Sequence, residues 1–403
     1  MKQYHQLLQD IKDTGTLKPA ARAGMPGTIS RFGYQFRHSL KDGFPAPTTK
    51  KLYWKGVVVE LLWFLRGDTN IKFLDQFGVR KMWHQDAYNF YKKIALENEN
   101  RNEIYRDNQD GTFSLFTFDE FCEIIKNKDR EDLPKIEHYT LGDCGYQYGK
   151  LWRNWETIDY WMNGSRPMPI HTITDQIKTV LTGLKETPEG RRHILTAIDP
   201  AHDTRLALYW CHALAQWNCR PLTFKERRDL AYDYAEKHNL FPLAIDAYGH
   251  KGIPEYMKVI DDTGWNIPKY HLDCQMYQRS ADSFLGVPLN IASYALLTHI
   301  FSEVCNMIPG DMIYTYGDLH IYEDHMDAVN LQLSRTPKEL PKLRINTEFW
   351  NQDPDTHTIS VEQFLATIET EGVKALIEDF QLDGYDPDPT ISANLSTGLQ
   401  LQK

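Results

Sequence analysis

The 403-residue sequence lacks the features that define several protein classes. Its six cysteines are scattered without a CxxC pair, which disfavours a disulfide framework or a structural zinc site and favours a reducing compartment. No run of eighteen apolar residues occurs, and the N-terminal stretch has no apolar core of a signal peptide. We therefore expect a cytoplasmic protein with no metal site and no membrane partner.

Acidic residues outnumber basic residues in the sequence. Lys and Arg total 45 against 55 Asp and Glu, a net charge of −10, and an acidic surface repels a nucleic acid polyanion. We expect no nucleic acid as substrate, although a local arginine cluster could still bind one nucleotide phosphate. An apolar content of 41% with 12% aromatic residues is ample for a core.

The most informative stretch runs from His271 to Tyr294. Its first half alternates in polarity like a strand, whereas from Asn290 apolar residues recur at helical spacing, with Gly286 at the corner between the two elements. The stretch carries Arg279, Ser280, Asp282 and Asn290, which could bind a phosphate and read the edge of a polar ring. An ordinary strand-to-helix connection with polar turn residues is the alternative.

Other segments have clear periodicity. We expect a helix over 2–14 that ends before Gly15, a glycine-containing loop over 22–33, and a buried helix over 54–65. Glu60 lies inside the buried helix, so its carboxyl must be paired, hydrogen-bonded or protonated, and a proton shuttle with a raised pKa is one reading. Leu206–Cys219 alternates like a strand that carries Cys211 and His212, and only His212 is a local candidate for lowering the thiol pKa.

QRSADSFLGVPLNIASY, at 278–294, resembles the most recognisable segment of thymidylate synthase and its relatives, the pyrimidine nucleotide hydroxymethylases. Further matches follow in the same order over about three quarters of the chain. They are DGFPAPTTKK at 42–51, ELLWFLRGDTNI at 60–71, Tyr148-Gly149-Lys150, Trp152-Arg153, DQI at 175–177, Arg191-Arg192, Cys211-His212, GDLHIYEDHMD at 317–327 and GYDPDP at 384–389.

The resemblance implies an α/β fold, with a large mixed sheet flanked by helices and two such sheets packed back to back in a homodimer. We expect one domain over 1–403 with two inserted blocks, at about 87–140 and 220–268. Each block has a helix announced by a capping box, Thr117–Glu120 in the first and Thr223–Glu226 in the second. We expect the blocks to be helical surface decoration near the cofactor cleft or the dimer rim, with a partner site as the alternative.

The resemblance also implies a reaction, in which a methylene group passes from 5,10-methylenetetrahydrofolate to C5 of dUMP. C5 of uracil is a poor nucleophile until a thiolate adds at C6, and the enolate so formed needs hydrogen-bond donors already in place. The expected catalytic residues are Cys211 as nucleophile, Glu60 for protons and water, Asn290 for the O4 and N3–H edge, Tyr148 and Asp282. Asparagine at 290, where the cytidylate enzymes have aspartate, indicates dUMP; helix capping is its alternative role.

The remaining site residues follow from the same resemblance. For the substrate phosphate and sugar we expect Arg22, Gln278, Arg279, Ser280, His320 and Tyr322, together with Arg191 and Arg192 from the other subunit, so that each active site is shared. For the folate we expect Lys50, Trp83, Asp282 and Gly286.

Two activities fit these residues. Reductive methylation to dTMP with release of dihydrofolate is favoured by Trp83, which would shield the reactive methylene from water. Hydroxymethylation of dUMP with release of tetrahydrofolate is favoured by the long polar ending SANLSTGLQLQK, since synthases usually end in a short apolar segment. A third hypothesis is an inactive nucleotide- or RNA-binding relative, but no nucleophile or phosphate arginine is lost.

Three departures from the family pattern are Ala23, His84 and the Tyr209-Trp210 pair.

Overall fold

The computed structural model describes residues 1–20, 24–79, 82–97, 104–110, 112–136, 138–163, 165–240, 253–347, 350, 358–370 and 377–394. Its helices are α1 Lys2–Thr14, α2 Trp54–Leu65, α3 Lys72–Gln76, α4 His84–Glu97, α5 Phe118–Asn127, α6 Tyr148–Arg153, α7 Gln176–Glu186, α8 Phe224–Lys237, α9 Ile253–Asp262, α10 Gly286–Cys305, α11 Met326–Leu333 and α12 Val361–Glu369. Its strands are β1 Thr16–Lys18, β2 Thr28–Ser39, β3 Tyr105–Asp107, β4 Phe113–Leu115, β5 Lys135–Ile136, β6 Tyr139–Thr140, β7 Trp155–Asn163, β8 Arg166–Thr174, β9 Ile194–Thr196, β10 His212–Pro221, β11 Tyr270–Asp282, β12 Ile308–Tyr322, β13 Lys342–Ile345 and β14 Phe380–Asp383.

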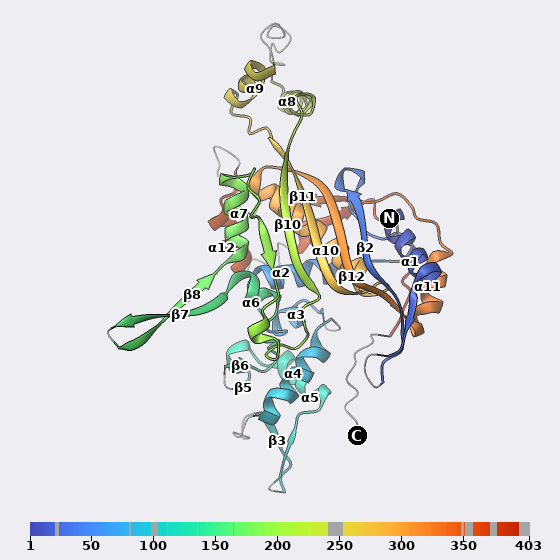
Figure 1. Ribbon diagram of the computed structural model, residues 1–403, viewed down its shortest axis with the longest axis vertical. Coiled ribbons are helices and arrows are strands. Elements are labelled where there is room, and N and C mark those ends of the chain that lie inside the picture. The colour runs from blue at the N-terminus through green and yellow to red at the C-terminus, as the bar shows by residue number, and fades with distance from the viewer. Residues whose placement is uncertain are drawn as a thin grey trace.

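One mixed sheet organises the molecule. In the described ranges it has six strands in the order β1-β2-β12-β11-β10-β9, with β11 and β12 parallel and the other pairs antiparallel. Helices α1, α2 and α10 cover one side of it (Figure 1). On β11 the residues Leu272, Cys274 and Met276 are buried, whereas Gln275 and Tyr277, which point to the opposite side, are exposed. The expected mixed sheet flanked by helices is therefore confirmed.

The expected helices at 2–14 and 54–65 are confirmed. The apolar stripe of α1 (Tyr4, Leu7, Leu8 and Ile11) is buried, and Gly15 follows as its C-cap. Helix α2 is buried nearly all round and ends at Leu65. Gly67 follows its C-cap Arg66, with a φ of 72° that glycine adopts at little cost. The alternating strand over 271–279 is confirmed as part of β11.

Three boundaries differ from the sequence expectation. Thr28–Gly33 is not a loop but the first half of β2, because it pairs with β12. Leu206–Cys211 is irregular, and strand β10 begins only at His212. The helix after β11 begins at Gly286 and not at Asn290, so the corner lies at 283–285.

The two inserted blocks lie at opposite ends of the molecule (Figure 1). The first holds α4, α5 and two short hairpins, and its side chains Phe90, Tyr91, Phe121 and Ile125 belong to the main hydrophobic core. It is thus packed more closely than surface decoration. The second holds α8 and α9, which pack around a small separate cluster of Ala231, Ile260 and Ile267.

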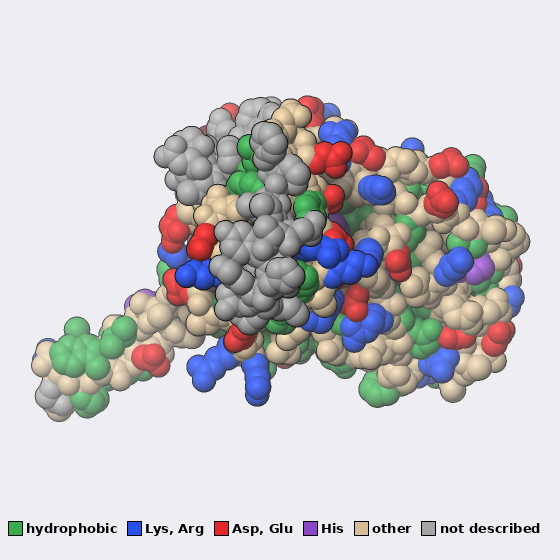
Figure 2. Space-filling model, turned by 90° about the horizontal axis from the view of Figure 1, so that it is seen from above, with side chains coloured by type: hydrophobic (Ala, Val, Ile, Leu, Met, Phe, Trp, Pro, Cys, Tyr) green, Lys and Arg blue, Asp and Glu red, His purple; other side chains and the backbone are tan. Residues whose placement is uncertain are grey.

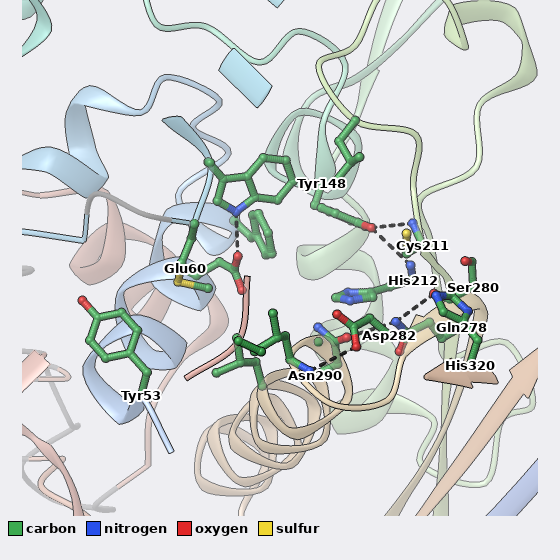
Figure 3. Close-up of a pocket in the computed structure, with 18 of the residues that line it drawn as sticks. Tyr53, Glu60, Tyr148, Cys211, His212, Gln278, Ser280, Asp282, Asn290 and His320 are labelled. Atoms are coloured by element: carbon green, nitrogen blue, oxygen red, sulfur yellow. Dashed lines mark hydrogen bonds between the residues drawn. The ribbon is translucent and has the colours of Figure 1, made fainter. Parts of the chain in front are cut away.

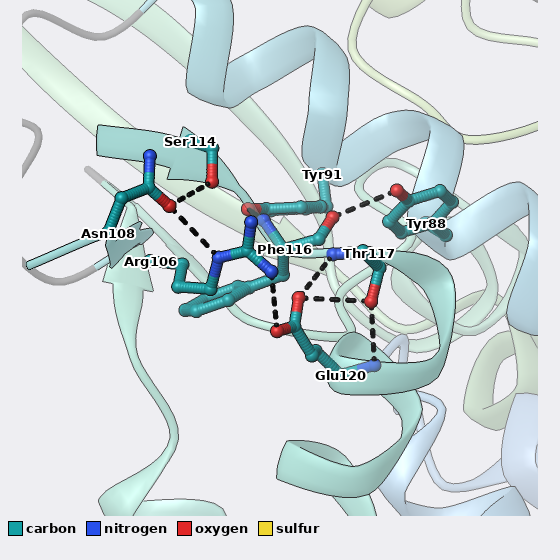
Figure 4. A network of polar contacts seen from close by, with 8 residues as sticks. All are labelled: Tyr88, Tyr91, Arg106, Asn108, Ser114, Phe116, Thr117 and Glu120. Atoms are coloured by element: carbon teal, nitrogen blue, oxygen red, sulfur yellow. Dashed lines mark hydrogen bonds and ion pairs between the residues drawn. The ribbon is translucent and has the colours of Figure 1, made fainter. Parts of the chain in front are cut away.

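Both expected capping boxes are present. At the start of α5, Glu120 N–H donates to Thr117 Oγ1 at 3.3 Å and Thr117 N–H donates to Glu120 Oε2 at 2.8 Å (Figure 4). Arg106 joins this cap from β3 through an Nη1 bond of 3.0 Å to Glu120 Oε1. The cap therefore connects α5 to the neighbouring hairpin as well as closing its own first turn.

A long hairpin of β7 and β8 extends away from the body and was not anticipated from the sequence (Figure 1). Every residue of β8, and all of β7 beyond Glu156, is exposed. It carries apolar side chains into solvent, with Tyr160 at 67% and Met162 at 60% exposure, and green side chains gather on the projecting arm in Figure 2. Exposed apolar surface of this kind is typical of protein contacts.

We expect Thr117→Ala to lower the free energy of unfolding by about 1 kcal/mol, because it removes the N-cap of α5. Urea unfolding followed by circular dichroism measures the effect. The matched control is Thr179→Ala in α7, whose hydroxyl bonds only back to Asp175 O within the helix, so its removal should be close to neutral. Equal losses in the two variants would contradict the capping role.

Candidate active site

A cavity of about 810 Å³ opens at the ends of β11 and β12, within the size range of small-molecule sites. Its walls bring together most of the side chains that the sequence singled out (Figure 3). Among the expected residues, those that line it are Glu60, Trp83, Tyr148, Cys211, Gln278, Ser280, Asp282, Gly286, Asn290, His320 and Tyr322. Segments from six distant parts of the chain thus converge on one pocket.

Cys211 is held by its backbone. Its N–H donates to the Tyr148 hydroxyl at 2.8 Å, and its carbonyl accepts from Arg279 N–H at 2.9 Å. The N–H of His212 also donates to the Tyr148 hydroxyl, at 3.1 Å. These amides bond to a side chain rather than to a neighbouring strand, which explains why regular β10 pairing begins only after Cys211.

The thiol of Cys211 experiences opposing effects. Burial raises its pKa, and the Arg279 guanidinium, with Nη2 at 3.8 Å from Sγ, lowers it, leaving the pKa raised overall. His212 does not assist as the sequence suggested, because burial lowers the pKa of its imidazole to about 4 and keeps it neutral near pH 7. Within the described ranges, Arg279 is the residue that favours the thiolate.

The departure at Tyr209-Trp210 has a structural explanation. The Trp210 side chain is fully buried, and its Nε1–H donates to Tyr146 O at 2.8 Å. Arg279 Nε in turn donates to Trp210 O at 2.5 Å, and its guanidinium lies over the Tyr209 ring at 4.6 Å. The pair therefore supports the backbone and the arginine beside Cys211.

An amide pair lies opposite the thiol. Gln278 Nε2 donates to Asn290 Oδ1 at 3.0 Å and to Ser280 O at 3.0 Å. Asn290 stands in the second turn of α10, which begins at Gly286, so the suggested helix-capping role is wrong. An amide held this way presents both a donor and an acceptor to a ligand.

Glu60 lies on the other side of the cavity. Its Oε1 accepts a bond of 2.6 Å from Trp83 Nε1–H, and the carboxyl is only 7% exposed. Burial raises the pKa of Glu60 to about 7, although the Trp83 bond lowers it somewhat. The carboxyl can therefore gain or lose a proton near neutral pH, as the sequence suggested.

Asp282 and the residues of β12 complete the wall. Asp282 Oδ1 accepts from the N–H groups of Phe284 and Leu285 at 2.9 and 3.2 Å. Burial raises its pKa, but His325 and these amides outweigh burial and lower the pKa overall. His320 Nδ1 lies 3.2 Å from Asp318 O, and its ring meets that of Tyr322 edge-on.

The structure does not bring every expected residue to the pocket. Arg191 and Arg192 are exposed, and Arg191 O accepts from Gln216, which is about 17 Å along β10 from Cys211. Lys50 is buried behind the wall, over the Phe284 ring at 3.6 Å and bonded to Phe284 O, and burial lowers its pKa to about 7. Arg22 lies outside the described residues.

Several lining residues were given no role from the sequence. They are apolar or small residues, namely Tyr53, Phe64, Gly78, Met82, Leu208, Leu285, Leu289 and Ala393. The available signal was position beside Trp83 for Met82 and position within a quoted motif for Leu285. Ala393 had no such signal, because it comes from the end of the described chain.

A deep pocket in a mixed α/β fold, holding a thiol, a buried carboxyl and paired amides, defines the class of the protein as an enzyme. A family model described as Thymidylate synthase matches residues 2–237 and 253–397. Relatives named Thymidylate synthase, from Listeria innocua serovar 6a and Listeria monocytogenes serotype 4a, are each 35% identical over 398 residues, which is 98% of this chain and 100% of theirs. The chain belongs to the thymidylate synthase family.

Two kinds of feature are absent from the described part of the chain. No helix there is long and apolar enough to cross a membrane. Within those ranges there is also no group of three or more His, Cys, Asp and Glu side chains that could hold a metal ion.

We expect Glu60→Gln to stabilise the fold by at most about 3 kcal/mol above pH 7, since each pKa unit corresponds to about 1.4 kcal/mol. The unfolded pKa is 4.5 and the folded pKa is about 7, so the folded chain binds the proton more tightly and loses stability as pH rises between these values. Glutamine keeps the acceptor for Trp83 and removes this loss. Urea unfolding at pH 5 and pH 8 measures it.

The control is Glu97→Gln at the exposed end of α4, which should leave the pH dependence unchanged. A Glu60→Gln chain whose stability falls with pH as steeply as wild type would contradict the buried ionisation.

Proposed function

We propose that this chain converts dUMP and 5,10-methylenetetrahydrofolate into dTMP and dihydrofolate. The observation that supports the proposal best is the placement of Cys211, Asn290 and Glu60 around one cavity that also exposes Trp83 and Asp282. Family membership and the named relatives support the same reaction. The reaction requires a thiol, an amide that hydrogen-bonds to the edge of the uracil ring, and a group that transfers protons, all in one pocket that excludes water.

In this proposal Cys211 adds its sulfur to C6 of the uracil ring, which turns C5 into a carbon nucleophile. Asn290, held by Gln278, bonds to O4 and N3–H and stabilises the negative charge that develops on O4. Tyr148 keeps the Cys211 backbone in position while the thiol reacts. C5 then attacks the methylene of the second substrate.

Glu60 serves in the proton steps. With a pKa of about 7 its carboxyl can transfer protons through water at the pyrimidine, including the loss of the C5 proton. Trp83 holds that carboxyl and forms part of the apolar wall that excludes water from the transferred carbon. The attack of C5 opens the bond from the methylene to one folate nitrogen, and loss of the C5 proton breaks its bond to the other. Hydride then passes from the tetrahydrofolate so released to the exocyclic methylene, which leaves dihydrofolate, the Cys211 thiolate leaves from C6, and dTMP is released.

The binding roles follow the pocket. Arg279 and Ser280, at the end of β11, contact the phosphate, joined by Arg22, and His320 with Tyr322 holds the sugar hydroxyl. Asp282 and Gly286 contact the folate. Lys50 does not line the cavity, but it supports the folate-binding side of the pocket through its contact with Phe284.

The proposal includes a back-to-back homodimer. Arg191 and Arg192 are exposed and remote from their own Cys211, as residues that complete a partner's phosphate site would be. The sheet side opposite α10 carries exposed apolar groups, including Leu214 and Tyr277 at 37% each, which a second sheet would cover. A cytoplasmic location is also proposed, and all six cysteines, which lie within the described ranges, are free thiols.

The hydroxymethylase alternative is not favoured, because the matched relatives carry the synthase name. Of the polar ending that supported it, only residues 392–394 are described, and the rest lies outside the described residues. The inactive relative is not favoured either, since Cys211 lines the pocket and Arg279 Nη2, although Arg279 does not line it, lies 3.8 Å from the Cys211 sulfur.

Mass analysis of the nucleotide product tests the activity. With dUMP and methylenetetrahydrofolate we expect dTMP, and Cys211→Ser should lose at least about 99% of kcat while its dUMP dissociation constant changes little. 5-Hydroxymethyl-dUMP as the main product would establish the alternative reaction. No product from a folded wild-type chain would contradict both.

Subunit mixing tests the shared site. Cys211→Ser chains and Arg191→Ala/Arg192→Ala chains should regain activity when mixed, because one site in each heterodimer then has an intact cysteine and intact partner arginines. The control replaces the second chain by one carrying Cys211→Ser as well, which should stay inactive. If exchanged heterodimers, verified by mass spectrometry, show no gain, the arginines do not act across the interface.

A further inference from the structure

His325 is a fully buried histidine directly behind the pocket, with 0% side-chain exposure. It ends the short helical turn Glu323–His325 between β12 and α11. Its ring centroid lies 5.4 Å from that of Tyr322, edge-on, and 5.7 Å from that of Phe284. Burying an imidazole costs free energy unless its nitrogen atoms form hydrogen bonds or ion pairs. The contacts of the two nitrogens therefore determine its structural role.

The two nitrogens face different parts of the chain. Nε2 lies 2.7 Å from Asn394 O, and because a carbonyl can only accept, Nε2 carries a hydrogen. Nδ1 lies 3.8 Å from Asp282 Oδ1. If the ring were neutral, Nδ1 would present a lone pair to a carboxylate, whereas the doubly protonated ring offers a donor to both partners.

The surrounding charges favour the protonated ring. Burial lowers the pKa of His325, but Asp282, the Asn394 carbonyl and Asp324, whose Oδ1 is 3.9 Å from Nε2, raise it overall. Lys50, on the other side of Asp282, is the cation that competes for the same carboxylate. Burial lowers the pKa of Lys50 to about 7, so this competition is weakened.

One partner of His325 lines the pocket, and the other is next in sequence to a residue that lines it. Asp282 lines it at the end of β11, and Ala393, the residue before Asn394, lines it from the last described segment. Residues 282 and 394 are far apart in sequence, and the ring of His325 lies between them in contact with both. The segment 390–394 and the β11 end therefore share one buried connection.

We propose that His325 is a positioning residue that joins the segment 390–394 to Asp282 through the two nitrogens of its ring and thereby orders the folate-binding side of the pocket. This inference rests on the proposed function, since it takes the second substrate to be a folate. His325 does not touch the reacting atoms, so its effect is on the binding of the second substrate and on the closure of the pocket.

Two substitutions separate the two contacts. In His325→Gln the amide nitrogen can replace Nε2 and keep the bond to Asn394 O, and in His325→Asn it can replace Nδ1 and keep the contact with Asp282. Each variant should raise the KM for methylenetetrahydrofolate about tenfold, within the usual range of coupling between two sites, and leave the dissociation constant for dUMP unchanged. Restoring both contacts requires histidine.

The matched control is His38→Gln. His38 is also buried, at 1% exposure, and its Nε2 lies 2.9 Å from Gly43 O, but it is on β2 and does not line the cavity. Its substitution should leave the folate KM unchanged even where it lowers the melting temperature. A folate KM that stays at the wild-type value in folded, dUMP-binding His325→Gln and His325→Asn chains would overturn the proposal.

Amide hydrogen exchange gives a readout that does not depend on turnover. Without ligands, His325→Asn should speed exchange in 390–394, and His325→Gln should speed exchange of the Phe284 and Leu285 amides, which bond to Asp282. A wild-type chain that makes no dTMP while both segments respond as stated would reject the proposed function and keep the connection. Unchanged exchange in both segments would reject the connection itself.

If neither variant folds, the wild-type chain decides. Titration of its dUMP complex with a non-reactive folate analogue should protect 283–285 and 390–394 over the same concentration range. Protection of the two segments at clearly different concentrations would overturn the inference.

Discussion

The site depends on the way the backbone of Cys211 is fixed. Its N–H and that of His212 both donate to one phenol oxygen, and its carbonyl accepts from Arg279 N–H on the neighbouring strand. Because the phenol of Tyr148 comes from the first turn of α6, the thiol stays at the junction between an irregular segment and β10. A thiol fixed in this way at the pocket wall needs little reorganisation to reach a ring carbon, which reduces the entropic cost of the covalent step.

Burial is the main cause of the pKa shifts of the ionisable groups around that thiol. It raises the pKa of Glu60 and Cys211 and lowers the pKa of His212 and Lys50, in each case against the charged form. For Glu60 this is useful, since a proton carrier works best near the operating pH. For Cys211 it is a hindrance that Arg279 only partly offsets. The burial that suits the Glu60 carboxyl therefore works against the Cys211 thiolate.

Periodicity could predict the elements that surround the site, because α1 and β11 each bury one clear face and α2 is apolar and buried nearly all round. Periodicity predicted the wrong boundaries where a backbone N–H bonds to a side chain instead of to its usual partner in a strand or helix. The Tyr148 hydroxyl accepts from the N–H of Cys211, just before β10 begins, and the Asp282 carboxylate accepts from the N–H of Phe284, just before α10 begins at Gly286. The alternation of polar and apolar residues in 206–219 could not reveal either of these side-chain bonds. The resemblance located the motif residues of the pocket, whereas Ala393 depends on a contact between distant segments that no local pattern records.

The first inserted block has a structural consequence for the chemistry. Trp83 directly precedes α4, and its carbonyl accepts the N–H of Ala87, so the indole is placed by the first turn of that helix. The helix is in turn fixed to the main core through Phe90 and Tyr91. Since the indole N–H bonds to Glu60, the position of the buried carboxyl depends on how firmly the block is packed. The second block, with a separate small cluster, has no comparable connection in the described part of the chain, and the two insertions are therefore not equivalent.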